Sequence, residues 1–184
     1  MLAHFNHQWR DEAAEDARFV EQLAGELGWK YLQGQADQQS IHSEEVARQQ
    51  RYAFLLEVAR SEGARFVVTA HTADDQVETI LDRILRGTGL RGLSGIPRTR
   101  VLDEGIVLLR PMLCCHKSEL EEYLHELGQG WCEDESNLDT DFTRNRIRHQ
   151  LLPFLKSEFQ PSVEESLLNL AELAGQTQQF LQRR

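Results

Sequence analysis

The stretch FVVTAHTADDQVETILDRILRG, from Phe66 to Gly87, joins an apolar segment to an amphipathic helix through an acidic junction. The β-branched run at its start is typical of a short buried strand. After the junction, apolar side chains recur on one helical face, at Val77, Ile80, Leu81, Ile84 and Leu85. Gly87 ends the helix, because glycine readily adopts the left-handed conformation that follows a last turn. The stretch therefore predicts a strand that leads directly into a helix.

The carboxylates at this junction have two interpretations. In the first, Thr72 and Asp75 form a T-x-x-D capping pattern and Asp74 complements the helix dipole. Glu78 is not explained in this way, and its charge repels the other carboxylates unless a cation lies between them. In the second interpretation, the acidic pair at the strand end holds Mg²⁺ together with substrate phosphates. The residues alone leave both interpretations open.

Strand and helix patterns alternate along most of the chain. Helices are expected at residues 12–27 and 44–62 and in the segment that ends at Gly87. A fourth helix is expected to begin with Ser118 and Glu121 as its capping box and to end at Gly128, and a fifth is expected after Ser162. The other expected strands are LAHF at 2–5, KYLQ at 30–33 and IVLL at 106–109, and residues 87–100 are expected to form a loop.

This order of elements predicts an α/β fold, in which a parallel sheet is covered by helices on both faces and a helical C-terminal part begins near Ser118. Ligands bind at the carboxyl ends of the strands in such sheets. His71, Asp74 and Asp75 fall at this position in the sequence. The fold prediction therefore makes the acidic junction the first candidate site.

Composition limits the classes of function. The net charge of -10 argues against a protein that coats nucleic acid, although arginines gather between Arg83 and Arg100 and in TRNRIRH at 143–149. No run approaches the ~20 apolar residues of a membrane span, and the N-terminus lacks the residue order of a signal peptide. We therefore expect a cytoplasmic protein that does not associate with membranes.

Several motifs resemble those of one known family. H-x-x-D-D-x-x-E-T at 71–79 is followed by R-G-x-G-L-x-G-L at 86–93. Further matching segments, in the family's order, are NHQWR at 6–10, EVARQQRYAFL at 45–55, LRPML at 109–113, WCEDESN at 131–137 and RNRIRHQLLP at 144–153. Over nearly its whole length, the chain resembles the tRNA(Ile)-lysidine synthetases, which are N-type ATP pyrophosphatases of the PP-loop superfamily.

The resemblance implies an adenine nucleotide alpha hydrolase-like, Rossmann-type fold and a two-step reaction on tRNA(Ile) with a CAU anticodon. Mg-ATP adenylates the C2 oxygen of the wobble cytidine and releases pyrophosphate, and the ε-amino group of free L-lysine then displaces AMP to leave lysidine. Such a protein must neutralise the triphosphate charge, orient the base and hold the lysine. The implied cofactors are ATP and Mg²⁺, and the implied partners are tRNA(Ile) and lysine.

The resemblance also implies roles for individual residues. The catalytic residues would be His71, Asp74, Asp75 and Glu78, with Asp74 and Asp75 beside Mg²⁺ or the substrate ammonium group. The residues expected to bind ATP phosphates are Arg48, Arg51 and Arg146, since arginine forks match phosphate oxygens. Those expected to contact tRNA are Arg86, Arg91, Arg144, Asn145 and Arg148. The alternative is that these arginines are solvated surface charges or partners of helix ends and nearby carboxylates.

The family's glycine-rich S-G-G-x-D-S loop has no counterpart in the sequence, and neither has the strand before it. We expect residues 1–116 to form a partial N-type ATP pyrophosphatase domain and residues 117–184 its helical C-terminal part. Three explanations remain open: a chain begun at an internal methionine, a non-catalytic relic that still binds tRNA or protein, and a loop supplied by another chain.

Two rival functions also remain open. The first is a tRNA thiolation enzyme of the same superfamily. Those enzymes commonly carry paired cysteines, whereas Cys114 and Cys115 are adjacent in this chain. The second is a non-enzymatic tRNA-binding module, which would bind tRNA without forming an ATP-dependent product.

Overall fold

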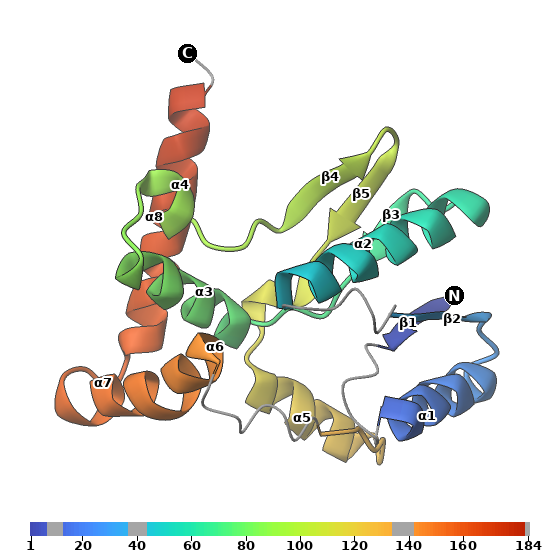
Figure 1. Cartoon of the computed structure of the whole chain (residues 1–184). Helices are drawn as coiled ribbons and strands as arrows, with labels where there is room; N and C mark the ends of the chain where they lie inside the picture. The colour runs from blue at the N-terminus through green and yellow to red at the C-terminus, as the bar shows by residue number, and fades with distance from the viewer. Residues whose placement is uncertain (7–12, 37–43, 134–141, 183–184) are drawn as a thin grey trace. The chain divides into compact units, whose positions relative to one another are not determined.

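The computed structural model describes residues 1–6, 13–36, 44–133 and 142–182 (Figure 1). The chain forms two compact units: unit 1 contains Met1–Val67 and Arg100–Leu109, and unit 2 contains Val68–Thr99 and Arg110–Arg184. Each unit has its own buried apolar cluster. Two of the motif segments, NHQWR and WCEDESN, lie partly outside the described residues.

Unit 1 begins with a parallel pair of strands. β1 (Leu2–Asn6) pairs with β2 (Tyr31–Gln35), with Leu2 opposite Tyr31. The helix α1 (Ala13–Glu26) lies between them in the sequence, since parallel strands need a crossover connection. Both strands predicted near the N-terminus are thus confirmed.

The helix α2 (Glu44–Ser61) packs against this strand pair through Phe54. The ring centroids of Phe54 and Phe5 are 5.6 Å apart. Phe54 also covers Gly34, where an added Cβ atom would come within 2.6 Å of the Phe54 ring. Glycine at this position in β2 therefore allows the helix to approach the sheet closely.

A second sheet has the strand order β3-β5-β4, with β3 at Phe66–Val68, β4 at Thr99–Asp103 and β5 at Ile106–Leu109. β4 and β5 form a hairpin (Figure 1). Val67 is buried in the cluster that includes Ala59 of α2, while its two neighbours in β3 are exposed. Side chains alternate between the two faces of a strand, so the predicted burial of this segment is confirmed on one face and is wrong on the other. The described strands thus form two sheets.

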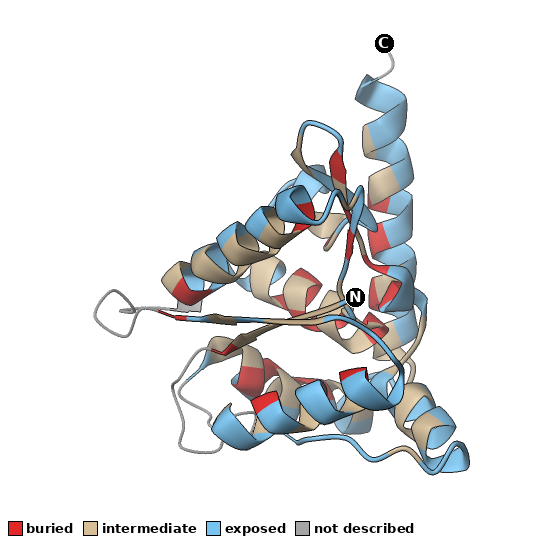
Figure 2. Ribbon diagram, turned by 90° about the vertical axis from the view of Figure 1, so that its right-hand side faces the viewer, coloured by how far each residue is buried: buried red, intermediate tan, exposed pale blue. Residues whose placement is uncertain are grey.

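Unit 2 is built around α3 (Ala73–Leu85), the helix predicted from the opening stretch. In Figure 2 the buried residues of the helices and strands are red and the exposed ones pale blue. Its buried face packs with η3 (Ile147–Leu151), α7 (Leu152–Glu158) and α8 (Val163–Gln182). The shared cluster consists of Val77, Ile80, Leu81, Ile147, Leu152, Leu167 and Ala171. The first three confirm the predicted face, whereas Ile84 and Leu85 are exposed because the packing ends before the last turn of α3.

The segment expected to be a loop, residues 87–100, is partly ordered into regular structure. It contains the short helix α4 (Leu90–Leu93), and β4 already begins at Thr99. Arg83 supports this segment, because its Nη1 donates hydrogen bonds to the carbonyl oxygens of Gly92 at 2.9 Å and Gly95 at 2.7 Å. The loop prediction was wrong here because these bonds depend on a side chain outside the segment.

The helix α5 (Lys117–Glu126) begins earlier than its predicted capping box. Glu119 Oε2 accepts a hydrogen bond from the amide of His116 at 2.6 Å, so His116 occupies the N-cap and the prediction of Ser118 with Glu121 was wrong. A short 3-10 helix, η1 (Pro111–Cys114), precedes it. The alternation of strands and helices and the helical C-terminal part confirm the predicted α/β class. Within the described residues, the helices are too short or too polar to cross a membrane.

Candidate functional site

The first turn of α3 is closed by the predicted capping pair. The amide of Thr72 donates to Asp75 Oδ2 at 2.7 Å, and the amide of Asp75 donates to Thr72 Oγ1 at 3.4 Å. These reciprocal bonds satisfy amides that have no partner inside the helix. The capping interpretation of Asp75 is therefore confirmed, and it leaves the second carboxylate oxygen of Asp75 for another partner.

That partner is an arginine from the C-terminal part of the chain. Arg144, on α6 (Thr143–Arg146), forms an ion pair with Asp75 through its Nη2 and donates from Nε to Glu78 Oε2 at 2.5 Å. Arg148, one turn further along, donates from Nε to Glu78 Oε1 at 2.5 Å. We call Asp75, Glu78, Arg144 and Arg148 the Glu78 cluster.

Glu78 is the most deeply buried member of this cluster, with a side chain that is 1% exposed. A buried carboxylate is strongly destabilising unless it is both paired and hydrogen-bonded. Both of its oxygens accept from a guanidinium group, so this requirement is met. The repulsion expected among the junction carboxylates is relieved here by two arginines.

Asp74 points to a different partner from its neighbour Asp75. Asp74 Oδ2 accepts from the amide of Lys117 at 2.7 Å, and Oδ1 lies 3.6 Å from His116 Nδ1. Burial raises the pKa of Asp74, but the Lys117 amide and His116 outweigh that effect, so the pKa of this carboxyl lies below its ordinary value. Asp74 thereby fixes the start of α5 against the start of α3.

The carboxylates at this junction do not by themselves fit a divalent ion. Both oxygens of Asp75 and Oδ2 of Asp74 accept from the partners given above, and the described residues hold no group of three or more His, Cys, Asp or Glu side chains that could bind a metal. Hard cations such as Mg²⁺ need several free oxygen ligands. Mg²⁺ at Asp74 and Asp75 therefore remains a prediction.

The other predicted residues of unit 2 lie in varied surroundings. His71 precedes the capping residue and has its Nδ1 3.0 Å from Thr69 Oγ1. Asn145 is buried, next to the two cluster arginines in the sequence. Arg146 is exposed and donates to Thr143 Oγ1 at 3.1 Å. The structure thus brings Asp75, Glu78, Arg144 and Arg148 together, while Arg146 points elsewhere.

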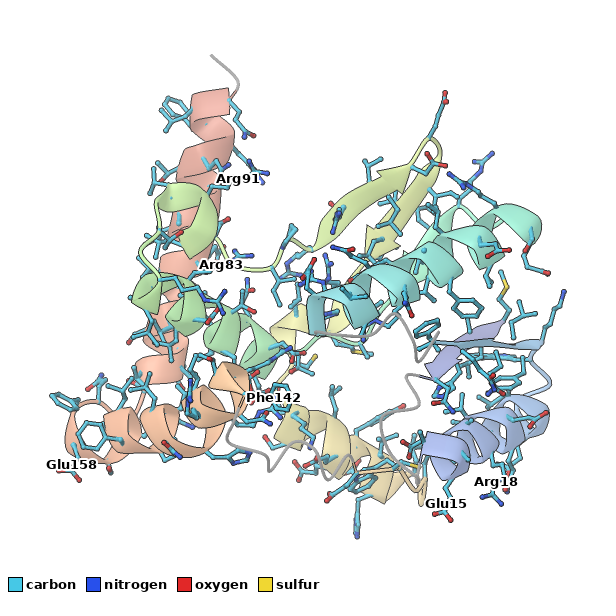
Figure 3. All side chains as sticks on the ribbon, in the orientation of Figure 1. Glu15, Arg18, Arg83, Arg91, Phe142 and Glu158 are labelled. Atoms are coloured by element: carbon cyan, nitrogen blue, oxygen red, sulfur yellow. The ribbon has the colours of Figure 1, made fainter. Side chains whose placement is uncertain are left out.

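Two predicted tRNA contacts lie near the end of α3. Arg86 pairs with Asp82 one turn earlier at 2.9 Å, which is the alternative that the sequence left open for it. Arg91 is exposed on α4, and Figure 3 labels it together with Arg83 of α3. Of these two arginines, Arg86 pairs with a carboxylate, whereas Arg91 forms no salt bridge within the described residues.

Sequence reasoning missed Gln76, which connects α3 to the glycine-rich segment. Its Oε1 accepts from the amide of Ile96 at 2.5 Å, and its Nε2 donates to the carbonyl oxygen of Ile96 at 3.3 Å. Gly95 has a φ of +65°, and an added Cβ there would lie 2.5 Å from Gln76 Oε1. The sequence signal that could have indicated this contact is a glutamine inside D-D-Q-x-E-T, followed by the glycine motif at 86–93.

The remaining predicted phosphate contacts, Arg48 and Arg51, lie in unit 1. Both are on α2, and their guanidinium carbons are 5.8 Å and 5.7 Å from the ring centroid of Tyr52. Arg100 of β4, which was not predicted, lies 6.0 Å from the same centroid. We call these four residues the Tyr52 arginine group.

Comparison with known proteins identifies relatives over the whole chain. The PP-loop domain family matches residues 1–155. The tRNA(Ile)-lysidine synthase of Nostoc sp. is 35% identical over 182 residues, which is 99% of this chain and 53% of the relative. The enzymes of that name from Geobacter sulfurreducens and Bacillus subtilis are 38% and 37% identical, over 100% and 99% of this chain and 40% of each relative. The chain therefore spans about half the length of these curated relatives, or less.

A solved structure has the same fold. The U34-tRNA thiolase NcsA from Methanococcus maripaludis, solved with its [4Fe-4S] cluster, matches with a TM-score of 0.73 over 94% of this chain and 60% of that chain. The two sequences are 13% identical, so this likeness concerns the fold alone.

Proposed function

The chain belongs to the PP-loop domain family, and on that premise we propose that it takes part in the ATP-dependent ligation of lysine to C2 of the wobble cytidine of tRNA(Ile). Its relatives of 35% to 38% identity carry the name of that activity. The same proposal includes a cytoplasmic location, and it takes free lysine and a tRNA(Ile) with a CAU anticodon as the substrates. It also includes a boundary at residue 116 between the partial ATP pyrophosphatase domain and the helical C-terminal part.

The observation that carries the proposal is the Glu78 cluster. Lysine is a zwitterion with an additional ammonium group, so its site needs both carboxylates and a cation. Asp75 and Arg144 supply one of each, and their side chains are 21% and 41% exposed. Glu78 is buried and accepts hydrogen bonds from both Arg144 and Arg148, so Glu78 and Arg148 hold that pair in position. We assign lysine binding to Asp75 and Arg144, and positioning to Glu78 and Arg148.

After lysine has bound, the protein's main task in the proposed reaction is to orient the lysine amine relative to C2 of the cytidine. Adenylation converts the C2 oxygen of cytidine into a leaving group. The lysine ε-nitrogen forms a bond to C2 while the bond from C2 to oxygen breaks, and AMP leaves with the electron pair as the amine loses a proton. Holding the amine in line with C2 makes this step effectively intramolecular. His71 and Asp74 complete the proposed catalytic set, with Asp74 acting by placing α5.

The phosphate and RNA contacts complete the proposal. Arginine matches phosphate oxygens through its planar fork, and Arg146 is exposed beside the cluster in the sequence. We propose that Arg146 binds phosphate of ATP, that Arg48 and Arg51 bind phosphate oxygens, and that Arg86, Arg91 and Asn145 serve tRNA binding. Mg²⁺ would accompany ATP, and none of the steps above is assigned to it.

The test is incorporation of labelled lysine into tRNA(Ile) with a CAU anticodon in the presence of ATP. The protein is assayed alone and fused to a family-type S-G-G-x-D-S segment, with a tRNA carrying uridine at the wobble position as the control. We expect lysine in the CAU tRNA and stoichiometric AMP. ATP-dependent transfer of sulfur would instead support the thiolation enzyme, and tRNA binding by both forms without any product would support a non-enzymatic module.

A further inference from the structure

The Tyr52 arginine group gathers three cations around one aromatic ring. Arg48 and Arg51 come from α2 and Arg100 comes from β4, all within unit 1. Each guanidinium is attracted electrostatically by the aromatic ring. Three cations at one ring also repel one another, so the arrangement favours the binding of an anion.

Two cations of this group form no salt bridge within the described residues. Arg48 and Arg100 are exposed, and neither forms a salt bridge with a carboxylate in the described part of the chain. The same helix and strand carry a contrasting pair: Arg60 donates to Asp103 Oδ2 from Nε at 2.9 Å and from Nη2 at 2.5 Å. α2 and β4 thus neutralise Arg60, whereas Arg48 and Arg100 have no salt bridge to a described carboxylate.

The ring at the centre is held in place by the core of unit 1. Tyr52 is half-buried and packs against the cluster of Ala59, Val67, Ile106 and Leu108. The guanidinium carbons of Arg48 and Arg100 lie 5.8 Å and 6.0 Å from its centroid, on side chains that come from α2 and β4. Two cations carried by different elements can each contact a separate phosphate along one nucleic-acid backbone.

We propose that the Tyr52 arginine group binds the backbone of single-stranded RNA, with Arg48 and Arg100 on separate phosphates. Single-stranded RNA is commonly held by arginines and aromatic rings on an exposed surface. The chain as a whole is acidic, with a net charge of -10, so a local cationic group must provide the attraction. The proposal rests on the proposed action on tRNA, and it adds Arg100 and Tyr52 to that function.

The test compares Arg48→Gln, Arg100→Gln and their double variant with Arg60→Gln. Binding of tRNA(Ile), and separately of an oligouridylate, is measured at several salt concentrations. Arg48→Gln and Arg100→Gln should each make the negative slope of log K for RNA binding against log salt less steep by about 0.7–0.9. The double variant should bind RNA about tenfold more weakly at ~0.1 M salt. Arg60→Gln removes one charge from the same elements and should leave the slope unchanged. The KM for ATP is measured for the same variants, because the phosphates of ATP are the other ligand expected for Arg48.

Three results would overturn the proposal: an unchanged slope in the double variant, an equal loss in Arg60→Gln, or a higher KM for ATP with RNA binding intact. The last would assign the group to the nucleotide. Binding of the oligouridylate that depends on Arg48 and Arg100, together with no binding of tRNA(Ile), would support the RNA site and contradict the proposed function. The two proposals can therefore fail independently.

Discussion

The Glu78 cluster and the Tyr52 arginine group use the same residue type for opposite purposes. In the first, Arg144 and Arg148 bind carboxylates of α3, one of which is 1% exposed. In the second, Arg48 and Arg100 surround a tyrosine and have no salt bridge to a described carboxylate. Arg144 and Arg148 are four residues apart and Arg48 and Arg51 are three apart, so sequence spacing does not separate the two regions, and the difference comes from the partners that the fold supplies. The buried carboxylate of Glu78 stabilises the fold through its two arginines, whereas the exposed Arg48 and Arg100 contribute little to folding and face solvent.

The largest effect should follow from Glu78→Ala. The change removes the acceptor of two guanidinium groups and leaves a cavity, so the free energy of unfolding should fall by about 3 kcal/mol. Urea unfolding measures it, with Glu57→Ala on the exposed side of α2 as the matched control. A loss below about 1 kcal/mol would show that the Glu78 cluster does not stabilise the fold, and the contrast between the two regions would disappear.

An intermediate effect is expected when the same substitution is made in each region. Arg148→Met leaves the buried carboxylate of Glu78 with one partner and should cost about 2 kcal/mol of unfolding free energy. Arg100→Met should change that free energy by less than about 0.5 kcal/mol, since Arg100 is exposed. Thermal and urea unfolding of both variants give the comparison directly, and equal losses would contradict it.

A smaller loss than that of Arg148→Met is expected at Asp74, whose side chain is 33% exposed. Asp74→Asn weakens the bond from the Lys117 amide and should cost about 1 kcal/mol near pH 7. The pKa of Asp74 is lower in the folded state, so its contribution is complete above the unfolded value of ~3.9 and is lost as pH falls through the folded value. Unfolding measured between pH 2 and pH 7 should therefore show a shallower acid decline in the variant. Parallel curves would mean that Asp74 does not hold α5.

Sequence reasoning succeeded where the interaction is local. Thr72 and Asp75 are three residues apart, and their capping bonds formed as predicted. The face of α3 was also predicted up to Leu81, because a helix repeats its apolar positions regularly. Local propensity and periodicity are properties of a short segment, and they survive folding when the tertiary structure agrees with them.

Sequence reasoning failed where a distant residue decides the outcome. Glu78 and Arg148 are 70 positions apart, so spacing gave no sign that they pair. The start of α5 shifted because Glu119 caps His116 and Asp74, 43 positions before Lys117, accepts its amide. β4 was missed because its pairing with β5 compensates for a sequence that carries two charged residues in five. Each error follows from a contact that the order of residues does not reveal.

The separation in sequence between Glu78 and its two arginines also affects the order in which unit 2 folds during translation. Arg144 follows Glu78 by 66 residues, and Arg148 follows it by 70. At the ~5–20 residues per second of protein synthesis, α3 exists for roughly 3–13 s before its partners have been made. During that interval the apolar face of α3 cannot bury Glu78 without isolating an unpaired charge. Completion of unit 2 is therefore coupled to translation of the RNRIR segment, and an arrest before it would leave α3 exposed to chaperones and proteases.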